Sequence, residues 1–136
     1  MRKMLILARD AGYPLEPDDI DIENLLPAAC REAESVEDFY RQLKASASYF
    51  NELKTKAENE GKVLRYIGKL EDGNVEISLQ MVDENHPFYM LSGSDNIISF
   101  TTDRYSERPM VVKGPGAGAE VTAAGVFADL INVGAE

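Results

Sequence analysis

Two alternating segments on either side of Asp72-Gly73 constrain the fold most strongly. Residues 62–71 and 74–82 both alternate apolar with polar side chains, which is the period of a half-buried β-strand. Asp-Gly between two such segments favours a two-residue turn, because both turn positions need a positive φ that aspartate and glycine adopt at low cost. The sequence therefore predicts an antiparallel β-hairpin. Its apolar faces consist of Leu64, Tyr66 and Leu70 on the first strand and Val75, Ile77, Leu79 and Met81 on the second.

Helices are predicted on both sides of this hairpin. Residues 2–11 have helical spacing and precede Gly12, a residue typical of a helix C-cap. Ser35 begins a second helix with a capping-box pattern, and residues 46–48 separate it from a third helix that ends near Glu60. A last helix is predicted over residues 119–133. The expected buried face of the first helix comprises Met4, Leu7, Ala8 and Ala11.

Three further short strands are predicted over residues 20–23, 96–102 and 110–113. The chain has 136 residues, of which 44% are hydrophobic, and a chain of this length buries about two-thirds of its unfolded surface. The expected fold class is α+β, with helices packed on one face of a mainly antiparallel sheet and a C-terminal helix.

Charge and composition exclude several classes of function. The net charge is −10, and the acidic excess lies between Asp10 and Asp38, so a nucleic-acid or anionic-membrane surface is not expected. No apolar run is long enough for a transmembrane helix. A single cysteine, Cys30, and a single histidine, His86, predict neither a disulfide framework nor a metal site. The single cysteine fits a reducing compartment, and a cytoplasmic location is expected.

Residues 114–119 (GPGAGA) match the dinucleotide-binding pattern G-x-G-x-x-G/A between a strand and a helix. Glycines let a backbone approach a phosphate, and a helix N-terminus favours an anion. Only one helix follows, however, so a complete dinucleotide site is not present. From the residues alone, a tight turn and a cofactor contact both remain open for this loop. The position of Lys3 alone indicates a surface cation. A role in proton transfer would require burial near a carboxylate that adjusts the pKa of the lysine.

Three segments together resemble the homoserine dehydrogenase family. The first is RKMLILAR at residues 2–9, which is similar to the end of the family signature Asp-Val-Ala-Arg-Lys and the apolar helix after it. The second comprises residues 60–68, 86–89 and 93–96, which are most like the bifunctional aspartokinase–homoserine dehydrogenases. The third and most specific is VVKGPGAGAEVTAAGVFADLI at residues 111–131, which resembles the C-terminal end of the family.

This resemblance implies an oxidoreductase that interconverts L-aspartate 4-semialdehyde and L-homoserine with NADP or NAD. The reaction belongs to threonine, methionine and isoleucine biosynthesis. Lys3 matches the lysine that the family is proposed to use as proton donor and acceptor at the substrate oxygen. Gly118 matches the glycine that touches the nicotinamide cofactor. The resemblance therefore implies that Lys3 is catalytic and that Gly118 binds the cofactor, and it implies no metal ligand in this chain.

The resemblance also implies how the chain is organised. Residues 1–113 are expected to be the substrate-binding and dimerisation part, and residues 114–136 the loop and helix that return to a nucleotide-binding domain. That Rossmann domain and the acidic residues that hold homoserine precede Lys3 in the family. The chain is thus expected to be a fragment that is inactive alone, forms a homo-oligomer through its sheet, and brings Lys3 close to Gly118. The alternatives are a stand-alone small-molecule or regulatory binding module of amino-acid metabolism, and a purely structural interaction domain.

Overall fold

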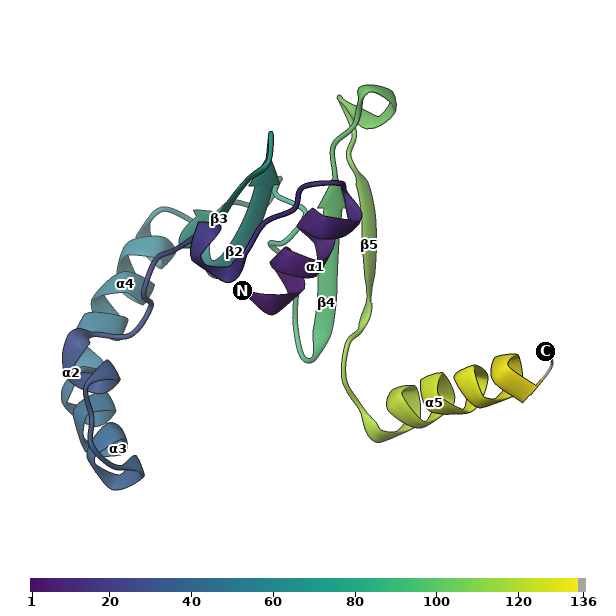
Figure 1. The fold of residues 1–136 in the computed structure, drawn as a ribbon. Coiled ribbons are helices and arrows are strands. Elements are labelled where there is room, and N and C mark those ends of the chain that lie inside the picture. The colour runs from purple at the N-terminus through teal and green to yellow at the C-terminus, as the bar shows by residue number, and fades with distance from the viewer. Residues whose placement is uncertain (135–136) are drawn as a thin grey trace. The chain divides into compact units, whose positions relative to one another are not determined.

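The computed structural model describes residues 1–134, and its elements fall into two units, Met1–Asp83 and Glu84–Glu136. The predicted hairpin is the centre of the first unit (Figure 1). Strand β2 (Val63–Glu71) pairs antiparallel with β3 (Asn74–Val82), from Glu71 opposite Asn74 to Val63 opposite Val82. Asp72 and Gly73 adopt φ values of 49° and 81°, so the predicted turn is confirmed.

A short third strand completes this sheet in the order β1-β3-β2. Strand β1 (Ile20–Ile22) pairs parallel with β3, with Ile20 opposite Val75. Glu23 extends the pairing beyond the strand, because its N–H donates to the Ile77 carbonyl (2.8 Å) and its carboxylate accepts the Leu79 N–H (2.7 Å). The carboxylate therefore takes the place of a backbone carbonyl where β1 ends.

The core of the first unit lies between this sheet and helix α1 (Arg2–Asp10). Ala8 is completely buried against one face of the sheet. The buried cluster comprises Ala8, Ile20, Val75 and Ile77, and around it pack Met4, Leu5, Leu15, Ile22 and Leu70. Burial of Met4 and Ala8 agrees with the predicted helix face.

Ala11 does not belong to that face, although the helical spacing predicted it. It is exposed and forms the C-cap of α1. The chain turns away at Gly12, whose φ is +93°, and the Tyr13 N–H donates to the Ala8 carbonyl (2.9 Å). This closing turn, typical of helix ends at a glycine, carries Ala11 off the sheet.

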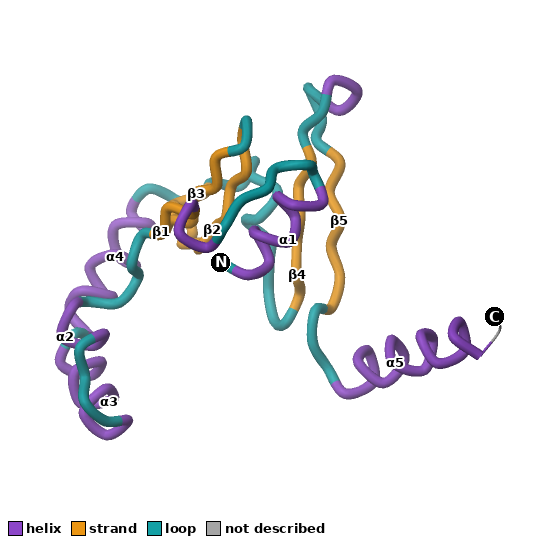
Figure 2. The backbone as a smooth tube through the Cα atoms, in the orientation of Figure 1, coloured by secondary structure: helices purple, strands orange, loops and turns teal. Residues whose placement is uncertain are grey.

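Three helices, coloured purple in Figure 2, connect β1 to β2: α2 (Ala28–Arg31), α3 (Val36–Ala45) and α4 (Ala47–Asn59). The Ser35 hydroxyl accepts the Asp38 N–H (3.1 Å), which confirms the predicted N-cap. Ser46 ends α3 where predicted, and its hydroxyl donates to the Gln42 carbonyl (2.9 Å). The acidic stretch between Asp10 and Asp38 contains α2 and a 3-10 turn at Pro17–Asp19.

The second unit contains a two-stranded antiparallel sheet of β4 (Asp95–Phe100) and β5 (Met110–Pro115). A 3-10 turn at Asp103–Tyr105 lies between the two strands, and helix α5 (Ala119–Gly134) follows β5. Strand β5 runs two residues beyond the predicted Lys113, because Gly114 and Pro115 pair with Asn96 and Asp95. The α+β class is confirmed, with its strands divided between two sheets.

Candidate functional site

Lys3 lies in the first turn of α1 and is exposed. The next residue, Met4, is partly buried against the core cluster, and Ala8 anchors the helix one turn further on. The first turn contains no acidic residue and carries Arg2 and Lys3. Cations near a helix N-terminus oppose the helix dipole, so helix stability does not explain a lysine here. The packing beneath Lys3 holds its backbone in a defined position.

Two glycines of the loop before α5, Gly116 and Gly118, have different environments. A Cβ on Gly116 would lie 1.3 Å from the Asn96 side-chain nitrogen, so this position has no space for a side chain. Gly118 has a φ of +147°, which disfavours other residues, and a Cβ there would meet only Val121, at 4.0 Å. The Gly118 carbonyl accepts the Thr122 N–H (3.0 Å) in the first turn of α5. The loop thus combines a packing constraint at Gly116 with an open, glycine-dependent backbone at Gly118.

His86 serves the loop that follows β3. Its Nδ1 accepts the Phe88 N–H (3.1 Å), its carbonyl accepts the Tyr89 N–H (2.9 Å), and its ring packs edge-on against Phe88 with centroids 5.0 Å apart. These contacts fit the capping and packing role that its loop position favours over a general base. Cys30 is buried 3.8 Å from the Ser46 hydroxyl, which is the setting of a structural thiol.

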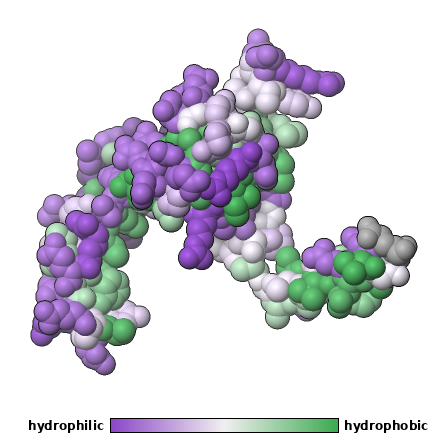
Figure 3. Space-filling model, viewed as in Figure 1, coloured by the Kyte–Doolittle hydropathy of each residue, from purple (hydrophilic) through white to green (hydrophobic). Residues whose placement is uncertain are grey.

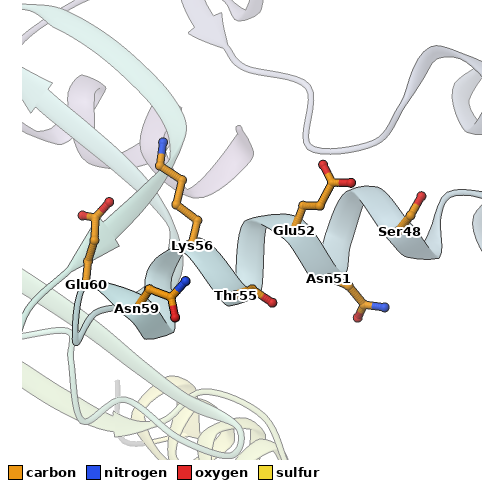
Figure 4. Close-up of a pocket in the computed structure, with 7 residues that line it drawn as sticks. All are labelled: Ser48, Asn51, Glu52, Thr55, Lys56, Asn59 and Glu60. Atoms are coloured by element: carbon orange, nitrogen blue, oxygen red, sulfur yellow. The ribbon is translucent and has the colours of Figure 1, made fainter.

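A shallow hollow of about 640 Å³ runs along the outer side of α4. Its lining residues, shown in Figure 4, are Ser48, Asn51, Glu52, Thr55, Lys56, Asn59 and Glu60. One helix and its C-cap supply every one of these residues, so no opposing wall encloses a ligand. The hollow is the polar surface of a helix and does not have the form of an active site.

Glu60 and Lys62 form an ion pair beside this helix end, with Lys62 Nζ 2.7 Å from Glu60 Oε2. The hydrogen bond and charge of Lys62 lower the pKa of Glu60 below its ordinary 4.5. Those of Glu60 raise the pKa of Lys62 above 10.5. The stabilisation from Glu60 is therefore present above pH 4.5 and lost as the pH falls through the lowered pKa. That from Lys62 is present below pH 10.5 and lost as the pH rises through the raised pKa.

Glu60→Gln is accordingly expected to lower the melting temperature slightly at neutral pH and not at all in strong acid. The effect is small because both side chains are partly exposed. Melting curves of the unsubstituted chain and of Glu60→Gln, recorded at pH 7 and at successively lower pH, measure the difference in melting temperature. A difference that persists undiminished below the pKa of Glu60 would show that the ion pair is not its cause.

Within residues 1–134, no group of three or more histidine, cysteine or carboxylate side chains is placed to hold a metal ion. None of the helices in that range has the length and apolar character needed to cross a membrane. Lys3 belongs to the first unit and Gly118 to the second, so their expected proximity stays a prediction. The crowding at Gly116 was not predicted, since nothing local in the sequence points to Asn96.

The fold is of the α+β class, and a glycine-containing loop leads from β5 into α5. Residues 1–131 match the family model described as homoserine dehydrogenase. The chain belongs to the homoserine dehydrogenase family.

Both bifunctional and single-function homoserine dehydrogenases are similar in sequence to this chain. The bifunctional aspartokinase/homoserine dehydrogenase of Daucus carota is 46% identical over 134 residues, which are 97% of this chain and 14% of that protein. The homoserine dehydrogenase of Schizosaccharomyces pombe is 44% identical over 135 residues, 97% of this chain and 36% of that protein. The chain thus spans 14% of the length of the first relative and 36% of the length of the second.

Two crystal structures have a similar fold. A Candida auris protein of unknown function matches with a TM-score of 0.84 and 39% identity, over 97% of this chain and 37% of its own. A putative homoserine dehydrogenase from Archaeoglobus fulgidus matches with a TM-score of 0.62 and 23% identity, over 96% of this chain and 33% of its own. The second likeness supports the fold alone.

Proposed function

We propose that this chain is the C-terminal, substrate-side part of a homoserine dehydrogenase. The observation that carries the proposal is the family match over residues 1–131, which includes both Lys3 and the glycine loop. In this proposal the whole enzyme interconverts L-homoserine and L-aspartate 4-semialdehyde, and the chain requires a nucleotide-binding part for activity. The boundary at Lys113 and Gly114 between substrate part and returning helix belongs to the same proposal, as does a cytoplasmic location.

Lys3 would move the proton of the reaction. In the oxidative direction the neutral amine accepts the proton of the homoserine hydroxyl, and in the reductive direction the ammonium returns a proton to the aldehyde oxygen. A lysine suits this exchange because its compact amine has three rotatable donors, and lysines act as general bases in proteins where they are buried. Lys3 is exposed, and the helix that carries it packs on the core through Met4 and Ala8.

Gly118 would contact the cofactor, NADP or NAD, which supplies the hydride acceptor when bound. The residues fit such a group in two respects. The space beside Gly118 is open where a Cβ would otherwise stand, and the first N–H groups of α5 lack carbonyl partners within the helix. Glu120 in the first turn disfavours a phosphate at this helix end, which supports contact with the nicotinamide portion instead.

Two exposed features support a larger assembly. Helix α5 exposes apolar residues throughout, including Phe127 (64%) and Leu130 (65%), and Figure 3 shows this helix as a largely hydrophobic surface. Such a surface suits packing against a nucleotide-binding domain. Strand β2 is an edge of its sheet, and an edge of nine residues can pair with a second copy. A homo-oligomer formed through the sheet is therefore also proposed.

A chimera tests the proposed activity directly. In this chimera the chain replaces the matching segment of the Schizosaccharomyces pombe homoserine dehydrogenase, which is 36% of that protein. We call this chimera the assembled enzyme. We expect homoserine-dependent reduction of NADP or NAD by the assembled enzyme and none by the 136-residue chain alone. A chimera that is folded by circular dichroism and binds the cofactor but is inactive would overturn the proposal. Saturable binding of a metabolite by the chain alone would then favour the binding-module alternative.

A further inference from the structure

Gly68 lies in the middle of β2, on the face that carries Leu64, Tyr66 and Leu70. It interrupts an otherwise apolar row with a residue that has no side chain. Its φ is not among the positive values of this chain, so the backbone does not require glycine here. A glycine inside a strand weakens it and marks a bulge or a close approach.

The close approach is made by Met4 of α1. A Cβ built on Gly68 would lie 2.6 Å from Met4 Cγ and 2.6 Å from Met4 Sδ. Both distances are far below van der Waals contact, so the two side chains cannot coexist without movement. The missing side chain of Gly68 is thus the space in which Met4 sits, and it sets how closely the first turn of α1 approaches the sheet.

Lys3 precedes Met4 directly, and the other end of α1 cannot take up a displacement. Ala8, one turn after Met4, is completely buried among Ile20, Val75 and Ile77. Helical side chains rarely adopt the χ1 rotamer near +60°, so Met4 can move its Cγ aside only by changing to its other helical rotamer, whereas its sulfur end moves more easily. A side chain at position 68 therefore requires either a new rotamer of Met4 or a displacement of the first turn of α1, which carries Lys3, and a role of Gly68 in placing Lys3 requires that the turn moves.

We propose that Gly68 is a positioning residue that acts through Met4 to place Lys3 for proton transfer. This inference rests on the role of Lys3 proposed above. Displacements of about 1 Å in a catalytic group cost up to about a hundredfold in rate, which is the scale of shift that this contact controls.

The test is a double-mutant cycle between Gly68→Ala and Met4→Ala in the assembled enzyme. Gly68→Ala alone is expected to lower kcat about tenfold to a hundredfold, with a smaller change in KM, and to shift the pH profile of kcat. Met4→Ala removes both atoms that the new Cβ would meet. The double variant should therefore regain kcat to within about threefold of Met4→Ala alone. Additive losses in the double variant would overturn the proposal.

Melting temperatures of the 136-residue chain with the same substitutions separate the contact from the catalytic role. Gly68→Ala is expected to lower the melting temperature, and Met4→Ala to absorb most of that loss in the double variant. This readout does not involve Lys3. Rescue of melting temperature without rescue of kcat would show that the contact is structural only, which overturns the positioning role.

The proposed function and this inference fail in different ways. If Lys3→Ala leaves the assembled enzyme active, the catalytic role of Lys3 fails while the melting-temperature cycle is unaffected. If Lys3→Ala abolishes activity and a folded Gly68→Ala variant keeps its kcat, Gly68 does not position Lys3. Should Gly68→Ala not fold alone, Met4→Ala and the double variant are compared. A double variant that is also unfolded would overturn the proposal.

Discussion

Replacing Lys3 with alanine is expected to lower kcat of the assembled enzyme by about 10²–10⁴-fold, the usual contribution of a positioned acid or base. Binding of the cofactor should change little, because in the proposed function Gly118 contacts the cofactor whereas Lys3 acts on the substrate oxygen. Steady-state kinetics in both directions, with cofactor affinity measured by fluorescence, provide the two quantities. An unchanged kcat would remove Lys3 from the mechanism.

Two further variants make this result specific. Lys3→Arg keeps the charge but not the ability to deprotonate, so it should be almost as inactive as Lys3→Ala. Lys54→Ala removes an exposed lysine on α4 that pairs with Glu58 at 3.6 Å, and it should leave kcat unchanged. Equal losses in Lys3→Ala and Lys54→Ala would point to a general electrostatic effect, and an active Lys3→Arg would exclude proton transfer by this residue.

Replacing Ile77 with alanine is expected to lower the free energy of unfolding by about 2–5 kcal/mol, the range for truncating a buried isoleucine. Ile77 is 5% exposed on the central strand β3 and belongs to the core cluster with Ala8, Ile20 and Val75. Ile20 on β1 cannot move into the cavity without loss of the pairing between β1 and β3. Urea unfolding of the chain, followed by circular dichroism, measures the change.

Ile6→Ala is the matched control for this substitution. Ile6 lies on α1 and is 60% exposed, so its truncation removes little buried surface and should change the free energy of unfolding by less than about 0.5 kcal/mol. A loss for Ile77→Ala no larger than that for Ile6→Ala would mean that the cluster between α1 and the sheet is not the core of this unit.

The elements that the sequence predicted well are those with local causes. The hairpin follows from alternation over residues 62–82 and from the two φ values that Asp72 and Gly73 accept. The cap at Ser35 follows from a hydrogen bond to a residue three positions away. In each case the decisive residues lie within one turn or one strand of each other, so a short segment already contains the signal.

The candidate site depended on more than periodicity. Position alone favoured a surface role for Lys3, and the glycine loop left a turn and a cofactor contact open. Only the likeness to the homoserine dehydrogenase family, confirmed by the match over residues 1–131, connects Lys3 and Gly118 with a reaction. A catalytic role requires that the side chain lie near a substrate and near a further catalytic or cofactor-binding group. The spacing of residues along one helix gives no information about either.

By itself the sequence determined the α+β class, the hairpin register, most helix ends and the family. The tertiary structure decided that Ala11 leaves the buried face of α1, that β1 lies parallel beside β3, and that Met4 and Tyr13 occupy the space beside Gly68 and Gly73. A Cβ on Gly68 would meet Met4, and one on Gly73 would lie 2.9 Å from the Tyr13 ring. Each of these pairs is separated by about sixty residues of chain. Such contacts arise only when distant segments pack together, so no local pattern encodes them.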